Sequence, residues 1–187
     1  MRTRVSGVPE ASGLAALGGD TFFLVDDERG IFHYAAEGRA QRLDAGGGLV
    51  DLEGIALAPD GRHLCVLSER DGSVWRFRID GASLRDGSRL GRLPALSKKK
   101  NRGWEGIAYA TPGIFGPGLQ LAAVHQAKPR RIGVFDPDTL EQHGSLRLPK
   151  NARTALGELN DLAVGIDGRI LLLSGKSGCI AEMRFAG

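Results

Sequence analysis

The chain has 187 residues, enough for one compact domain with a buried core, and its 25 basic and 22 acidic residues leave a net charge of +3. So small an excess argues against a nucleic-acid partner. Cys65 and Cys179 are too few for a disulfide framework or a zinc site, and we expect both to be small buried residues. No apolar run reaches the roughly 20 residues of a membrane span, and no signal peptide follows Met1, so we expect no membrane partner and, for the chain as written, a cytoplasmic location.

Four segments of the chain repeat one pattern. Each opens with a polar residue, a small or acidic residue, Ile or Leu, and then Ala, and continues through an apolar strand and a turn into a third strand. In the second segment Asp-Gly turns separate apolar runs, which is a strong hairpin signal. The segments are Glu10–Ala35, Asp51–Asp80, Gly103–Asp136 and Glu158–Phe185.

The polar residues that open the repeats are Ser12, Glu53, Glu105 and Asn160, at spacings of 41, 52 and 55 residues. Propeller blades recur at about 40–50 residues, and small residues in their inner strands let the blades converge. We therefore predict an all-β fold: a β-propeller of four visible blades, each of four antiparallel strands, in a single domain over residues 1–187. A β-sandwich also has short strands and turns, but it does not explain the shared opening.

The stretches between the repeats mix polar and apolar residues, as half-exposed outer strands do. We expect no helix beyond a single turn at Thr139–His143. Only three strands fit after Asn160, so either Met1–Val8 supplies the fourth strand of the last blade or a fifth blade is missing from this chain. The three expected outer strands are Arg39–Leu43, Ser88–Leu93 and Ser145–Leu148.

The polar openings predict a ring of oxygen ligands at the mouth of the central channel. Calcium takes six to eight hard oxygen ligands, and carboxylates crowded together are relieved by a cation. The alternative is that these carboxylates bond neighbouring amides or arginines at a wet rim. The predicted calcium ligands are Asp51, Glu53, Glu105, Glu158 and Asn160, flanked by Glu10, Ser12 and Asp161.

A second polar column follows the second strand of each repeat. In it we interpret Asp26–Glu28 and Glu69 as solvated turn residues, the commonest role of acidic residues at such positions. His125 lies in the same column of the third repeat and is expected to be a hydrogen-bonded structural residue, with a general base or a metal ligand as the alternative.

Two basic loops, Lys98–Arg102 and Lys128–Arg131, are interpreted as solvated faces, with binding of an anionic ligand or an acidic partner as the alternative. The chain has no glycine-rich phosphate loop before a helix, no His-Glu-x-x-His, no Cys-x-x-Cys and no Gly-x-Ser-x-Gly. Nucleophilic catalysis of the familiar kinds therefore has no support.

The order of these motifs resembles the SdiA-regulated (YjiK-like) family of bacterial β-propellers and, more distantly, NHL-type and gluconolactonase-type propellers. The resemblance runs from about Pro9 to Phe185 and is carried by Glu10–Ala15, Asp51–Ala56, Leu67–Arg70 and Asn101–Ala108. It implies a five-bladed propeller with a bound calcium. The chain departs from that family by lacking the last repeat and the N-terminal membrane or export segment of many members.

Two functions remain open at this point. The first is a non-catalytic scaffold with a calcium site that binds an unknown protein or a small-molecule ligand. The second is a metal-dependent hydrolase of lactones or phosphoesters, in which Glu105 or His125 would be the base. The second rests on analogy between folds, and one fold hosts many functions.

Overall fold

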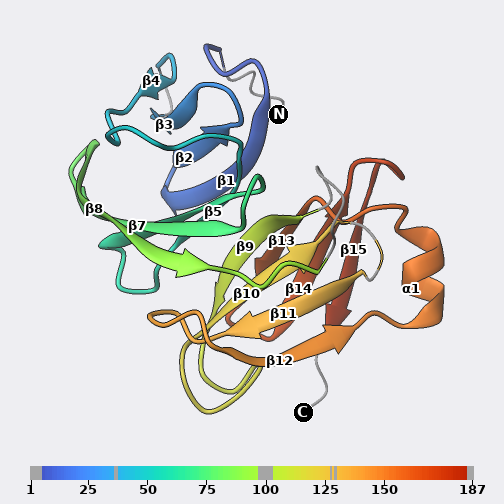
Figure 1. Cartoon of the computed structure of the whole chain (residues 1–187). Coiled ribbons are helices and arrows are strands. Elements are labelled where there is room, and N and C mark those ends of the chain that lie inside the picture. Colours follow the sequence, from blue (N-terminus) through green and yellow to red (C-terminus); the bar gives the residue numbers. More distant parts are fainter. Residues whose placement is uncertain (1–5, 36–37, 97–102, 127, 129, 185–187) are drawn as a thin grey trace.

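A computed structural model describes residues 6–35, 38–96, 103–126, 128 and 130–184. Four antiparallel sheets follow one another around an arc, from blue to red in Figure 1. The all-β propeller prediction is confirmed, with four blades in chain order. The strands are β1 (Ala11–Gly18), β2 (Thr21–Asp26), β3 (Gly30–Tyr34) and β4 (Gln41–Arg42) in blade 1; β5 (Leu52–Leu57), β6 (His63–Ser68), β7 (Ser73–Asp80) and β8 (Ser83–Arg92) in blade 2; β9 (Trp104–Ala110), β10 (Gln120–His125), β11 (Arg131–Phe135) and β12 (Gln142–Arg147) in blade 3; and β13 (Asp161–Val164), β14 (Arg169–Ser174) and β15 (Cys179–Arg184) in blade 4.

Blade 4 has three strands in the described part of the chain. The N-terminal segment does not complete it there: the backbone N–H of Ala40 donates to the carbonyl of Ser6 at 3.2 Å, and Val8 packs against the blade 1 cluster that contains Leu24 and Phe32. Residues 1–5 lie outside the described residues. The expectation that Met1–Val8 closes the ring is therefore wrong for residues 6–8, because their apolar contacts are made on the first blade.

One short helix was not expected. Helix α1 (Lys150–Ala155) begins after Pro149 and lies between β12 and β13. None of its six residues is buried, so it has no apolar stripe that periodicity could reveal. Pro149 is the N-cap of this helix and makes no capping hydrogen bond with its side chain.

Apolar side chains between consecutive blades form the core. Alternate residues of each inner strand face the preceding and the following blade, so blades 2 and 3 each contribute to two of the clusters between blades and the end blades 1 and 4 to one. The residues of the three interblade clusters include Val25, Ile55 and Phe77 for blades 1 and 2; Leu67, Trp104 and Phe135 for blades 2 and 3; and Val124, Leu162 and Leu172 for blades 3 and 4.

The two ends of the arc expose surfaces that are buried between the middle blades. Leu14 of β1 is 51% exposed, whereas Ile55, at the same position of the next repeat, is 4% exposed. At the other end Ile180 of β15 is 67% exposed, whereas the corresponding Val74 is fully buried. β5 packs on β1 and on β9, and β9 packs on β13, but no comparable packing joins the described strands β13 and β1.

Glycines allow the inner strands to touch backbone to backbone. A Cβ on Gly54 would lie 2.7 Å from the carbonyl oxygen of Glu105, and a Cβ on Gly106 would lie 2.6 Å from the Cα of Asp161. Both approaches are too short for any side chain, which gives a steric reason for the glycine that precedes Ile or Leu in three repeats. Glu53 and Glu105, which precede these two glycines, therefore also lie where the inner strands approach each other.

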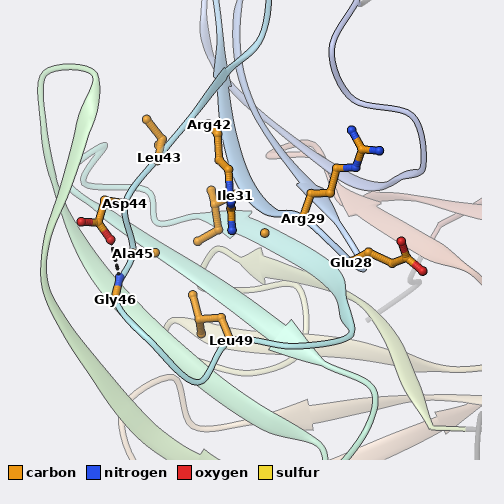
Figure 2. A pocket seen from close by; sticks show the side chains of 10 residues that line it. Glu28, Arg29, Ile31, Arg42, Leu43, Asp44, Ala45, Gly46 and Leu49 are labelled. Carbon is orange, nitrogen blue, oxygen red and sulfur yellow. Dashed lines mark hydrogen bonds between the residues drawn. The ribbon is translucent and has the colours of Figure 1, made fainter.

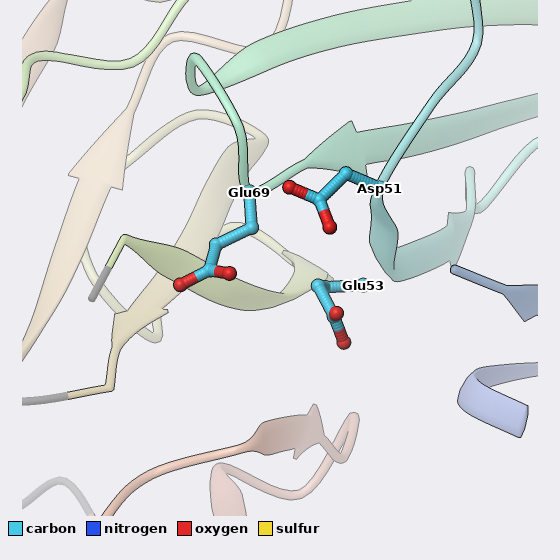
Figure 3. A group of neighbouring side chains, drawn as sticks. All are labelled: Asp51, Glu53 and Glu69. Atoms are coloured by element: carbon cyan, nitrogen blue, oxygen red, sulfur yellow. The ribbon is translucent and has the colours of Figure 1, made fainter. Parts of the chain in front are cut away.

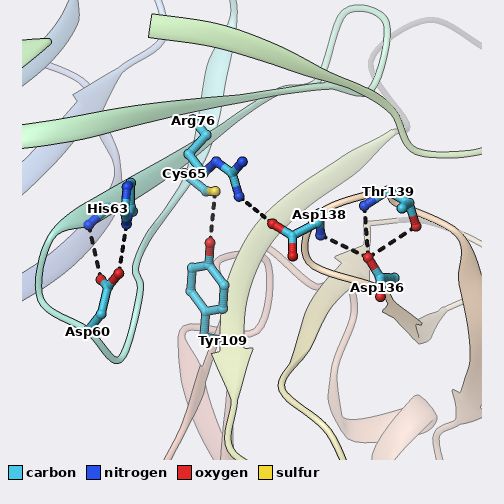
Figure 4. A network of polar contacts seen from close by, with 8 residues as sticks. All are labelled: Asp60, His63, Cys65, Arg76, Tyr109, Asp136, Asp138 and Thr139. Atoms are coloured by element: carbon cyan, nitrogen blue, oxygen red, sulfur yellow. Dashed lines mark hydrogen bonds and ion pairs between the residues drawn. The ribbon is translucent and has the colours of Figure 1, made fainter. Parts of the chain in front are cut away.

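Polar contacts also join blades 2 and 3 (Figure 4). The Sγ of Cys65 and the hydroxyl of Tyr109 lie 3.1 Å apart, and Arg76 forms an ion pair with Asp138. Asp136 holds the turn that presents Asp138 by accepting the N–H of Asp138 at 2.9 Å and that of Thr139 at 2.8 Å. Burial, the largest cause, raises the pKa of Cys65 to about 11, so this thiol stays protonated in the interface.

We predict that Gly106→Ala destabilises the protein by about 1–3 kcal/mol, the usual cost of overpacking, because the new methyl group meets the backbone of Asp161. Gly144→Ala in β12 is the matched control, since nothing lies within 4 Å of its added Cβ. Urea denaturation measures both. Equal midpoints for the two variants would contradict close backbone contact between β9 and β13.

Candidate metal centre

Three half-buried carboxylates meet beside the start of β5. One ligand oxygen from each of Asp51, Glu53 and Glu69 lies within 4.8 Å of the others. Figure 3 shows the three side chains as neighbours, with Asp51 and Glu53 coming from the start of β5 and Glu69 from the turn after β6. Two of these residues were predicted as ligands. Glu69 was interpreted as a solvated turn residue, and its place in this cluster corrects that interpretation.

Backbone hydrogen bonds hold Asp51 and Glu69 in place. The N–H of Asp51 donates to the carbonyl of Asp27 at 3.0 Å, and the N–H of Glu69 donates to the carbonyl of Asp51 at 2.9 Å. Asp51 has φ +57°, a left-handed conformation that aspartate tolerates better than most residues. The Oε1 of Glu69 accepts the N–H of Gly103 at 2.9 Å, which ties blade 2 to the segment leading into blade 3.

Burial and like charges make ionisation of this cluster costly. Burial, the largest cause, raises the pKa of Glu53 to about 7; a hydrogen bond with Ser12 opposes the rise, and the charges of Glu69, Asp27 and Asp51 add to it. Glu105 is 4% exposed, and burial together with the charges of Glu69 and Glu53 raises its pKa to about 9. A cation would offset this repulsion.

Of the remaining predicted ligands, Glu105 contacts this group and Glu158 acts on Glu105. Glu105 makes a side-chain hydrogen bond with Glu69, and the charge of Glu158 also raises its pKa. Glu158 lies 3.9 Å from the Nζ of Lys176, and the Oδ1 of Asn160 accepts the N–H of Gly175 at 2.8 Å. The assignment of these three residues as metal ligands therefore stays a prediction.

The first position of the second polar column is buried rather than solvated, whereas Glu28, two residues after Asp26, is exposed as expected. Asp26 is 1% exposed, and its carboxylate accepts N–H groups of Glu10, Glu28 and Arg29. Ser68 donates to the carbonyl of Val50 at 2.8 Å. The expectation of a solvated turn is thus wrong for Asp26, because this column binds the chain just before each inner strand.

His125 is also fully buried in that column. Its ring meets the indole of Trp104 edge to face, with 5.5 Å between ring centroids, and its backbone pairs with Trp104 across β9 and β10. This packing is what a structural histidine requires. A carboxylate, a hydroxyl and an imidazole therefore occupy one position in successive repeats, and their common property is burial beside the start of an inner strand.

A separate cavity of about 370 Å³ lies beside blade 1 and the loop before blade 2. In Figure 2 Glu28 and Arg29 extend away from Asp44, whose carboxylate accepts the N–H of Gly46 at 3.0 Å. Its charged residues carry both signs and do not converge. The first predicted basic loop, Lys98–Arg102, lies outside the described residues.

The fold and the carboxylate cluster define a β-propeller with a candidate metal centre. The family model "Phytase-like: Esterase-like activity of phytase" matches residues 6–176, most of the chain, and the chain belongs to this family. The resemblance to the SdiA-regulated family stays a prediction. No curated protein matches the chain.

Solved structures support the fold alone, because their sequence identities are low. Glutaminyl cyclase from Myxococcus xanthus has a TM-score of 0.63 at 17% identity, over 96% of this chain and 68% of that one. The nidogen/laminin complex has a TM-score of 0.62 at 16% identity, over 93% of this chain and 60% of that one. Hydrazine synthase from Kuenenia stuttgartiensis has a TM-score of 0.57 at 15% identity, over 97% of this chain and 48% of that one. The chain thus spans about half to two thirds of the length of these structures.

No helix within the described ranges combines the length and the hydropathy of a membrane-spanning segment.

We predict that the metal-free protein loses stability as the pH rises from about 5 to about 9. The raised pKa values of Glu53 and Glu105 mean that the folded state binds these protons more tightly than the unfolded state does. The stability that this proton binding contributes is present at low pH and is lost as the pH rises through about 7 and about 9. Urea denaturation in EDTA across this range measures the effect.

Glu105→Gln should flatten that pH dependence, because it removes the largest of these shifts, whereas Glu141→Gln at an exposed position should leave it unchanged. A metal-free protein whose stability rises over the same pH range would contradict the placement of these carboxylates.

Proposed function

We propose that the chain binds a divalent cation, calcium before others, at Asp51, Glu53 and Glu69, and that this site serves the hydrolysis of a phosphoester. The observation that carries the proposal is the convergence of three carboxylate oxygens within 4.8 Å. The family match to phytase-like proteins supports the phosphoester as the substrate class.

The donor set fits calcium. Calcium–oxygen distances are about 2.3–2.6 Å, so oxygens on opposite sides of one ion lie about 5 Å apart, and the separations in this cluster fall within that limit. Carboxylates are the hard ligands that calcium prefers. Three negative charges in a half-buried site would attract the ion more strongly than its hydration shell does in solution. When bound, the ion would polarise a phosphoryl oxygen.

The neighbouring residues position this cluster. Glu105 keeps its proton at neutral pH and hydrogen-bonds Glu69, so it fixes the orientation of that carboxylate without adding another charge. Because its side chain is almost entirely buried, Glu105 acts through Glu69 rather than on a substrate. Ser12 holds Glu53 in the same way from blade 1.

The second candidate is ion-dependent binding without turnover, in which calcium stabilises the junction of blades 2 and 3. The hydrogen bond from Gly103 to Glu69 favours it, because one of the carboxylates that would hold the ion already joins these blades. Both candidates require the same cation, and they differ only in whether a phosphoester is consumed.

We predict that calcium raises the thermal midpoint of the EDTA-treated protein, by mass action on the folded state. The gain should be larger at pH 8 than at about pH 5.5, because protons compete for Glu53. Glu53→Gln and Glu69→Gln should weaken calcium binding about tenfold or more in titration calorimetry. The exposed Glu141→Gln is the control. Equal calcium affinity of wild type and all three variants would show that the ion does not bind at this cluster.

Turnover separates the two candidates. With p-nitrophenyl phosphate and inositol hexakisphosphate as substrates, hydrolysis should require calcium, manganese or zinc, and Glu69→Gln should lower the rate by at least about tenfold at a fixed metal concentration. Metal binding without metal-dependent phosphate release would leave the binding function and exclude the hydrolase.

A further inference from the structure

Five cationic residues line one cavity of about 520 Å³ at the edge of blade 3, and they carry the only charges of its described lining. They come from the loop after β10, the first residue of β11, the last residue of β12, and α1. They are Lys128, Arg130, Arg131, Arg147 and Arg153. The structure thus adds arginines from two distant segments to the basic loop at Lys128–Arg131.

The cluster is electrostatically unfavourable as it stands. Arg131 and Arg147 are directly opposite each other on β11 and β12, a cross-strand arrangement in which like charges destabilise a sheet. Arginines elsewhere pair with carboxylates, as Arg76 does with Asp138 and Arg92 with Asp71. No carboxylate among the described residues forms an ion pair with the five pocket cations.

One arginine of this pocket, Arg130, is held by hydrogen bonds, and a second, Arg153, has a buried nitrogen that no described residue satisfies. The Nη1 of Arg130 donates to the carbonyl of Gly157 at 3.0 Å and also to the carbonyl of Leu156, which fastens the β10–β11 loop to the segment after α1. The Nε of Arg153 is buried and has no hydrogen-bond partner among the described residues. A pre-positioned guanidinium loses less freedom when it binds an anion.

We infer that this pocket binds a small anion carrying more than one phosphate group. Guanidinium groups match phosphate oxygens through paired N–H donors, and several phosphate charges are needed to neutralise five cations. The volume lies in the range of small-molecule sites. A single carboxylate would leave most of the positive charge uncompensated.

The pocket lies at the end of blade 3 where Glu105 lies. β10 ends beside the start of β9, as the pairing of His125 with Trp104 shows, so the β10–β11 loop and Glu105 share this end of the blade. Gly157, which accepts a bond from Arg130, precedes Glu158, whose charge acts on Glu105. A role of this pocket in binding the substrate rests on the proposed function. Binding of an anion in the pocket does not depend on it.

The test is calorimetric titration of the full chain with inorganic pyrophosphate in EDTA at low salt, which excludes any contribution from a divalent cation. Wild type should bind, and Arg131→Gln/Arg147→Gln should bind at least about tenfold more weakly. Affinity should also fall steeply with added salt, as expected for an anion held by several cations.

The matched control is Arg85→Gln/Arg169→Gln, which removes the same charge from two exposed arginines outside the pocket. Lys128→Glu, at an exposed loop position, should also weaken binding and provides a second variant if the double variant does not fold. Equal affinities of the pocket and control variants, or tight binding of triglutamate with none of pyrophosphate, would overturn the inference. Pyrophosphate binding in EDTA together with failed calcium binding would retain the pocket and reject the metal centre.

Discussion

The close approach of the inner strands is the constraint on which the rest of the structure depends. Gly54 contacts the backbone of Glu105, and Gly106 contacts that of Asp161, at distances that leave no room for a Cβ. Glu53 and Glu105 directly precede these glycines. The close approach of the strands therefore brings the two glutamates toward one another. The glycines that allow the blades to converge therefore also bring the carboxylates together.

This convergence has an electrostatic cost, which one buried proton lowers and which a bound cation would lower further. Glu105 stays protonated and shares a hydrogen bond with Glu69, which removes one charge from the group. Asp51, Glu53 and Glu69 keep oxygens close enough to share one cation, which would remove the rest of the repulsion. Positive charge is concentrated separately, around the outer edge of blade 3, so the same end of the propeller offers sites of opposite sign.

Much of the fold could be predicted from the sequence because each blade repeats the same opening, and Asp-Gly turns mark the strand ends in blades 2 and 4. The spacing placed the inner strands within a few residues of where the structure has them, and it identified Asp51 and Glu53 as members of one acidic cluster. Helix α1 was missed because a six-residue helix with no buried side chain leaves no periodic signal.

The burial of Asp26 and the position of Glu69 were missed for a different reason. Acidic residues next to a turn are usually solvated, and only the pairing of β1 with β2 and of β5 with β6 shows that this end of the strand lies under the start of the inner strand. The second polar column carried the signal: Asp26, Ser68, His125 and Ser174 recur at one position in four repeats. Equally, the pairing of Arg131 with Arg147 follows from strand register and could not be derived from composition.

Anomalous diffraction from crystals soaked in manganese is the most direct test of the central claim, since manganese accepts the same oxygen ligands as calcium and scatters anomalously. We expect one strong anomalous peak between the carboxylates of Asp51, Glu53 and Glu69. A map without a peak there, or with its strongest peak at another site, would contradict the metal centre.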